Sequence, residues 1–246
     1  MNDFWKRFAR NRSAVFGLGI IVLVVIIASI ASFIYPDDPF SLAGKPMSEP
    51  ALNGFLLGSA SLGRDVASGI AHGAKTSLLI GLIATLAAVF IGVVFGALAG
   101  YYGGRIDDVL MRITEVFQTI PSFVFAILLV AIMKPSIESI VIAITVVSWP
   151  GVARLVRGEF LALKNREFVQ ACHTLGMGDL RIMMAEILPN CLSPIIVIGS
   201  LMVATAILIE SGLAFLGLGD PNIMSWGFQI GAGRTMLRSA WWICTF

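Results

Sequence analysis

The chain has 246 residues, of which 57% are hydrophobic and 13% are charged, and its mean hydropathy is +0.90. Soluble domains carry about 25% charged residues, so this composition excludes an ordinary soluble domain and indicates a membrane protein. The net charge of +2 does not indicate nucleic-acid binding, because the basic residues are confined to a few segments between apolar runs.

Five uncharged runs are candidates for membrane spans, since about 20 apolar residues cross a hydrocarbon layer of about 30 Å. The first, residues 13–34, follows the basic residues Lys6, Arg7, Arg10 and Arg12. It is longer than the apolar part of a signal peptide and further runs follow it, so we expect an uncleaved anchor. The other runs are residues 76–104, 116–133, 139–153 and 187–209.

Small residues recur every four positions along the second run. A stripe of this kind lets a neighbouring helix approach closely, so it predicts helix packing and not a ligand site. The stripe consists of Ala84, Ala88, Gly92, Gly96 and Gly100.

Two carboxylates, Glu115 and Glu210, border or interrupt apolar runs. An ionisable group at membrane depth is costly, so each is a candidate pathway or gate residue. Both are near the ends of predicted spans, and an interfacial hydrogen bond is an alternative role for each.

A polar segment, residues 154–189, holds five of the seventeen lysines and arginines. Within it, Phe168, Ala171, Cys172 and Leu175 have the i, i+3, i+4, i+7 spacing of one helix face. Gly176 and Gly178 then predict a break, after which Asp179 can cap a second helix. A short amphipathic helix beside a membrane indicates a docking surface for a partner.

The distribution of basic residues predicts a cytoplasmic N-terminus, because that orientation places eleven of the seventeen on the inner side. Five spans then leave the C-terminus outside. The final residues, WWICTF, are expected to be the start of a sixth helix that the chain does not complete. In the alternative, Trp241 and Trp242 anchor a tail at the membrane interface.

Nothing in the sequence indicates a catalytic or metal site. The three cysteines show no C-x-x-C spacing, and the two histidines are far apart. Residues 69–77, GIAHGAKTS, differ from a phosphate-binding loop and lead into a span without a preceding strand. We therefore expect no enzyme activity, no bound ATP and no cofactor in this chain.

The polar segment resembles the EAA segment of bacterial ABC-importer permeases. That pattern has Glu-Ala-Ala, three residues, Gly, and later an Ile-x-Leu-Pro ending. Here the spacing is kept by Gln170, Ala171, Cys172 and Gly176, with Glu186 in the place of Ile and Pro189 at the end. The resemblance implies that Phe168, Gln170, Ala171, Cys172, Leu175, Gly176 and Pro189 couple the chain to an ATPase.

Other stretches are similar to the second permease subunit of dipeptide and oligopeptide importers. They are residues 8–39, 62–81, 101–121 and 210–227. The resemblance implies an all-α polytopic bundle of the type I ABC-importer permease fold, with five complete spans and the start of a sixth. We expect two regions: residues 1–55, with the N-terminal tail and first span, and residues 56–246, the permease core with its coupling segment at 154–189.

The implied protein is a multi-pass subunit of the bacterial inner membrane that moves peptides. Its implied partners are a second homologous permease, two cytoplasmic ATPase subunits that bind ATP, and a periplasmic substrate-binding protein. Two alternatives are a secondary transporter or channel, and a shortened, non-transporting relic of such a permease. Dipeptides, longer peptides, glutathione and nickel complexes all stay open as substrates.

Overall fold

The computed structural model describes residues 8–246, so Lys6 and Arg7 of the basic N-terminal segment lie outside the described residues. In the described part the regular structure is helical, and extended pairing is limited to one bridge between Ser59 and Asp65. The all-α prediction is confirmed.

The chain forms two compact units, which are described separately. The first consists of the chain up to Leu78 together with Pro221–Phe246, and the second is Leu79–Asp220. Within the first unit, loop residues near position 60 pack against the last residues of the chain.

Four long helical stretches of the described residues are apolar enough to cross a membrane, and each overlaps an expected span. They are α2 (Arg12–Ile34), α3 (Val66–Tyr102), α6 (Ile137–Leu163), and the continuous stretch made of α8 (Asp179–Arg181), η1 (Ile182–Ile187) and α9 (Leu188–Phe215). The stretches begin before their uncharged runs, where the helices include flanking residues, but α3 ends at Tyr102, before the expected end at residue 104, and Gly103 after it has a φ of +67°.

The expected span at residues 116–133 is not one straight helix. It is divided between α4 (Gly104–Gln118) and α5 (Ser122–Met133), whose axes differ by 80°. Pro121 is the N-cap of α5. Proline has no N–H and disfavours a helical conformation in the residue before it, so the helix ends here.

The first unit packs its last residues into its own core. α10 (Trp226–Gly233), η2 (Arg234–Met236) and α11 (Trp242–Thr245) end the chain. The indole of Trp242 is 3% exposed and donates a hydrogen bond to the Ser59 carbonyl oxygen at 3.1 Å. Trp241 is half-exposed. Of the two tryptophans, therefore, Trp242 is committed to tertiary packing.

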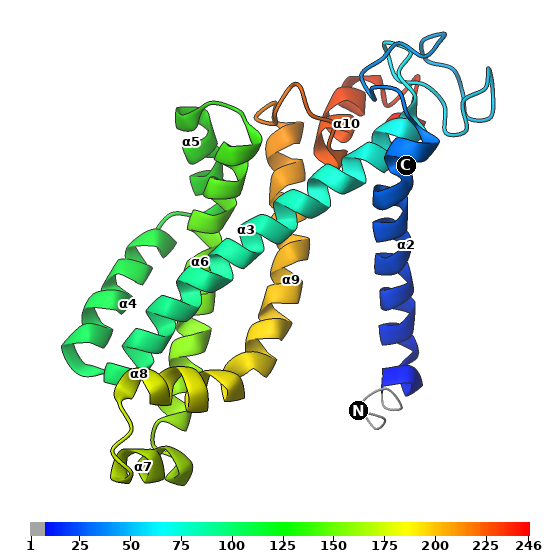
Figure 1. Ribbon diagram of the computed structural model, residues 1–246. Coiled ribbons are helices and arrows are strands. Elements are labelled where there is room, and N and C mark those ends of the chain that lie inside the picture. Colours follow the sequence, from blue (N-terminus) through cyan, green and yellow to red (C-terminus); the bar gives the residue numbers. More distant parts are fainter. Residues whose placement is uncertain (1–7) are drawn as a thin grey trace. The chain divides into compact units, whose positions relative to one another are not determined.

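In the second unit, α6 packs against α4, α5 and α9 (Figure 1). Near one end, Ala126 and Val130 of α5 share a core with Ile80 of α3 and Leu213 of α9. α4, by contrast, begins where α3 ends. The bent pair α4–α5 therefore runs from one end of this unit to the other.

The small-residue stripe of α3 faces α6. An added Cβ at Gly92 would lie 2.5 Å from Val152 Cβ, and one at Gly100 would lie 2.6 Å from Phe160 Cβ. Ala84 and Ala88 are fully buried on the same helix. The two backbones thus approach to a distance that leaves no room for larger side chains.

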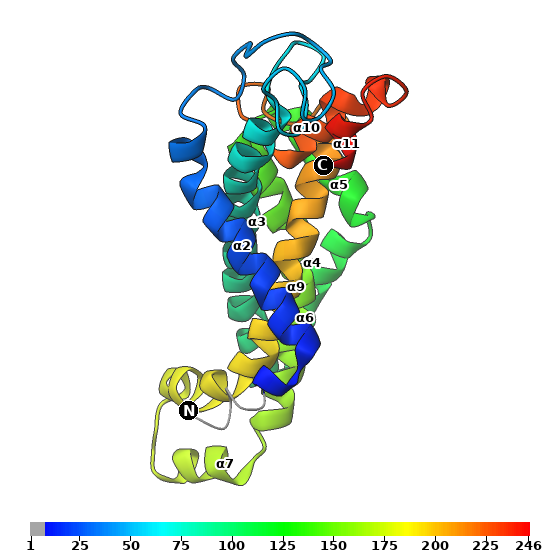
Figure 2. The same ribbon diagram turned by 90° about the vertical axis from the view of Figure 1, so that its right-hand side faces the viewer.

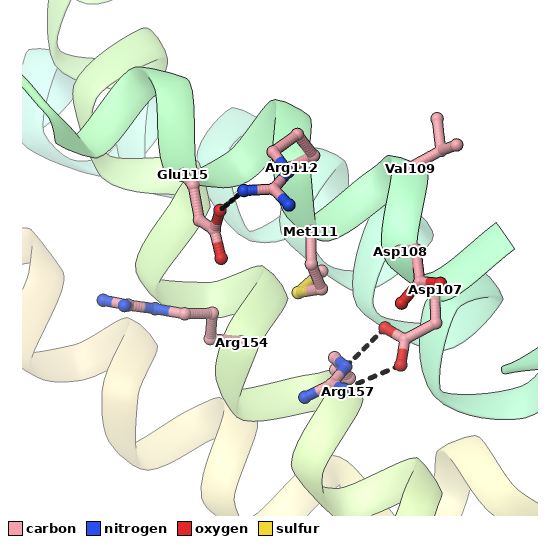
Figure 3. Close-up of a pocket in the computed structure, with 8 residues that line it drawn as sticks. All are labelled: Asp107, Asp108, Val109, Met111, Arg112, Glu115, Arg154 and Arg157. Atoms are coloured by element: carbon pink, nitrogen blue, oxygen red, sulfur yellow. Dashed lines mark hydrogen bonds and ion pairs between the residues drawn. The ribbon is translucent and has the colours of Figure 1, made fainter. Parts of the chain in front are cut away.

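Arg157 joins three helices of the second unit. Its main chain lies against α3, since an added Cβ at Gly100 would be 2.8 Å from the Arg157 carbonyl oxygen. Its guanidinium donates two bonds to Asp107 of α4, Nε to Oδ1 at 2.5 Å and Nη2 to Oδ2 at 2.7 Å (Figure 3). This bidentate pair fixes α4 to α6.

The close approach predicts the effect of Gly96→Ala. The added methyl group would lie 2.7 Å from Val156 Cβ, so we expect it to destabilise the protein by about 1–3 kcal/mol through overpacking. Thermal unfolding in detergent measures the change. Gly158→Ala is the matched control, because an added Cβ there meets nothing within 4 Å. Equal unfolding temperatures for both variants would contradict the close packing.

The ion pair predicts an energetic coupling between Asp107 and Arg157. A double-mutant cycle with Asp107→Ala and Arg157→Ala should give about 1 kcal/mol, since the pair is bidentate but partly exposed. The same cycle on Arg112 and Glu115, whose side chains are 81% and 62% exposed, should give a few tenths of a kcal/mol at most. A coupling no larger for the first pair than for the second would refute its role.

Candidate functional site

The polar segment forms a short helix, α7 (Glu167–Thr174), beyond the end of α6. The chain turns at Gly176, whose φ of +75° favours glycine, and α8 begins after Gly178. Figures 1 and 2 show α7 and α8 at the same end of the second unit. The two-helix arrangement expected from the glycines is present.

One face of α7 is anchored to the protein. Val169 is fully buried in a core with Ile182, Met183 and Ile187, and Cys172 packs against the same core. The sequence stripe therefore divides, because Cys172 faces inward with Val169. Val169 was not among the predicted site residues, although its i, i+3 spacing with Cys172 was a signal of this inner face.

The other face of α7 is open. Phe168 is 39% exposed and Leu175 is 81% exposed, with Ala171 also at the surface. Gln170 is exposed and donates to the Asn165 carbonyl oxygen at 3.3 Å. This face presents two large apolar side chains, Phe168 on α7 and Leu175 at its C-cap, on a helix whose reverse side is buried.

Tyr101 links α3 to both short helices. Its hydroxyl donates to Asp179 Oδ1 at 2.8 Å, and its ring stacks on His173 at 6.4 Å between centroids. The expected cap at Asp179 is wrong by one position: Gly178 holds the N-cap, and the Asp179 carboxylate accepts the bond from Tyr101. Sequence spacing could not reveal this partner, which is 78 residues away.

The stretch after α8 contains a π-helical turn, η1, followed by α9 with Pro189 in its first turn. Pro189 is exposed and has no N–H to donate to the preceding turn. The Asn190 side chain donates a hydrogen bond to the Glu186 carbonyl oxygen at 2.6 Å, so the turn before Pro189 has a side-chain contact of its own.

A cavity of about 770 Å³ lies between α4 and α6 (Figure 3). Its walls carry three carboxylates and three guanidinium groups. They come from Asp107, Asp108, Arg112 and Glu115 of α4 and Arg154 and Arg157 of α6, with Val109 and Met111 beside them. The spacing of Asp108, Arg112 and Glu115 at i, i+4 and i+7 was the signal for a shared face that the sequence analysis did not use.

The candidate pathway residues do not form one site. Glu115 lines the cavity and pairs with Arg112 at 3.4 Å, and both side chains are exposed. Glu210 is 1% exposed within α9, accepts a bond from the Ser211 hydroxyl at 3.4 Å, and is not part of the cavity wall.

Metal-ligating side chains do not gather in the described residues 8–246, where no group of three or more was found, and the three cysteines are free thiols.

The sequence matches two families of transport proteins. Residues 92–245 match the family described as binding-protein-dependent transport system inner membrane component, and residues 1–50 match the N-terminal TM domain of oligopeptide transport permease C. Together these matches cover 50 and 154 residues, or 204 of the 246, and leave residues 51–91 between them.

Relatives of known function agree with this family. The chain is 38% identical to the di/tripeptide transport system permease protein DppC of Pseudomonas aeruginosa, over 99% of this chain and 82% of that protein. It is 40% identical to the dipeptide transport system permease protein DppC of Bacillus subtilis, over 98% and 76%. It is 37% identical to the oligopeptide transport system permease protein OppC of Haemophilus influenzae, over 99% and 79%.

The fold is also similar to that of a solved transporter. A structure of the MetNI methionine ABC transporter in inward-facing conformations matches with a TM-score of 0.58, at 16% sequence identity, over 69% of this chain and 81% of that chain. At this identity the likeness concerns the fold alone. Of the alternatives, the family matches favour the ABC-importer permease over a secondary transporter or channel. The chain is thus a member of the binding-protein-dependent inner-membrane permease family, a multi-pass membrane protein with the type I ABC-importer permease fold.

Proposed function

We propose that this chain is one permease subunit of an ATP-driven importer of short peptides. It would act with a second homologous permease, two cytoplasmic ATPase subunits and a periplasmic binding protein. The relatives' names, as permeases for dipeptides, tripeptides and oligopeptides, support a peptide substrate. The observation that carries the coupling is the exposed apolar face of α7, at Phe168 and Leu175, on a helix whose other face is buried.

The anchoring of α7 supports transmission of force. A force applied to α7 would be transmitted to η1 and α9 through the packing of Val169. It would be transmitted to α3 through Tyr101, which contacts both short helices. α6 continues toward α7 and is fixed to α4 at Arg157. These contacts let the helices move as a rigid group, which is what a hinge-type change of access requires. ATP binding and hydrolysis belong to the partner subunits in this proposal.

The docking role predicts the effect of Phe168→Asp and Leu175→Asp. Each places a charge in an apolar contact, so each should reduce co-purification of the ATPase by about tenfold or more, as expected for interface anchors. Pull-down through a tag on this chain, with detergent-solubilised membranes, measures the loss.

Leu42→Asp is the matched control for docking, because Leu42 is 73% exposed in the first unit, outside the proposed docking surface. It should leave co-purification unchanged. If both α7 variants bind the ATPase as well as the unmodified chain does, α7 is not the docking surface.

The order of the spans supports an N-terminus on the same side as α7. Between them the chain crosses through α2, α3, the bent pair α4–α5, and α6. Four crossings return it to the side on which it began. The excess of basic residues on that side favours the cytoplasm.

This orientation predicts which positions an impermeant maleimide reaches. In a chain with its three cysteines replaced by serine, Gln170→Cys should react in inside-out vesicles only, because α7 faces the cytoplasm. Ser41→Cys, in the loop after α2, is the opposite control and should react in right-side-out vesicles only. The reverse pattern would show the opposite topology.

A further inference from the structure

We propose that the cavity between α4 and α6 binds the two charged ends of a short peptide, with Arg154 taking the α-carboxylate and one of the α4 carboxylates, Asp108 or Glu115, taking the α-ammonium group. This inference rests on the proposed function and names the residues that recognise the substrate.

Arg154 is the cation available for a ligand. It makes no hydrogen bond or ion pair with any residue in 8–246. Figure 3 shows that its side chain starts from α6 below Glu115 and that its guanidinium points away from Asp107, Asp108 and Arg157. A guanidinium group binds a carboxylate through two parallel N–H···O bonds, which suits the terminal carboxylate of a peptide.

The neighbouring arginine, Arg157, has a structural role. Both donor groups of Arg157 that face α4 are taken by Asp107, so this pair is part of the scaffold. Because Asp107 and Arg157 are committed to each other, the groups left for a ligand are Arg154, Asp108 and the weakly held Arg112–Glu115 pair.

The carboxylates for an ammonium group lie on α4. Asp108 is exposed, and Glu115 has one contact with Arg112 at 3.4 Å, between side chains that are 62% and 81% exposed. An exposed pair of this length contributes about 0–1 kcal/mol, so an incoming ammonium group can displace Arg112 at little cost.

The charge balance of the wall favours a zwitterion. Its three acids and three arginines sum to zero, so a ligand with one positive and one negative end keeps the cavity neutral. Its volume of about 770 Å³ is in the usual range for small-molecule sites.

The cavity wall has few groups that would distinguish one peptide side chain from another. Its apolar part is formed by Val109 and Met111, and a methionine adapts to side chains of many shapes. The recognised groups are the termini, which all short peptides share. The site therefore selects for free ends and short length, and tolerates different sequences.

The test uses the importer purified through a tag on this chain, in nanodiscs without ATP. Isothermal titration calorimetry compares dialanine, N-acetyl-dialanine and dialanine amide. We expect dialanine to bind, and each blocked peptide to bind about tenfold more weakly or worse, since each loses one charge-assisted contact. Equal binding of all three peptides, or no binding of dialanine, would overturn the proposal.

Substitutions in the cavity wall test which residues bind each end of the peptide. Arg154→Ala should weaken dialanine binding about tenfold or more and leave dialanine amide unaffected, while Arg154→Lys should retain part of the affinity. Asp108→Asn with Glu115→Gln should weaken dialanine and leave N-acetyl-dialanine unaffected. Arg105→Ala is the matched control, because Arg105 is exposed on α4 and does not line the cavity. Unchanged dialanine binding in the Arg154 and carboxylate variants would overturn the assignment.

Uptake of labelled dialanine separates this inference from the proposed function. Uptake that depends on the chain but is the same in the unmodified chain and in Arg154→Ala would refute the site and leave the peptide importer standing. If no peptide enters in a chain-dependent manner, the proposed function fails and the site fails with it. If the second permease subunit fills the cavity, crosslinks from Arg154→Cys to that subunit that dialanine does not reduce would reveal it and overturn the proposal.

Discussion

The close approach of α3 and α6 is the constraint on which the second unit depends. Within a membrane there is no hydrophobic force between helices, so contact between backbones, made possible by small residues, supplies much of the stabilisation. Gly96 and Gly100 let the main chain of Arg157 lie directly against α3. That position then allows the guanidinium of Arg157 to reach Asp107 on α4. A bulkier residue in the stripe would move α6 outward and disturb both contacts.

The same constraint connects the two functional regions. α6 forms one wall of the charged cavity and leads at its end into α7. α7 is held by Val169 in a core shared with η1 and α9, and Tyr101 at the end of α3 bonds to Asp179. In the proposed importer, a displacement of α7 would be transmitted through these contacts to the helices it packs against, and the cavity wall would move with them. In the proposed importer, this is how ATP-driven motion would change the surroundings of a bound peptide.

Much of the fold could be predicted because membrane spans follow from local composition. The uncharged runs locate α2, α3, α6 and α9, and the glycines at 176 and 178 locate the turn between the two short helices. The spacing at Phe168 and Leu175 indicated an apolar face on α7, and both side chains are exposed. The bend at Pro121 was present in the sequence as a proline, but its angle of 80° depends on how α5 packs against α6.

The sequence by itself determined the family, the helical class and the regions that enter the membrane, because these follow from motif spacing and from hydropathy summed along the chain. Only the tertiary structure decided which side of α7 is anchored, which arginine is bound and which is available, and that Glu115 and Glu210 belong to different surroundings. The physical reason is that these outcomes depend on contacts between helices far apart in sequence. Tyr101 with Asp179 and Asp107 with Arg157 are such contacts, and no local pattern specifies them.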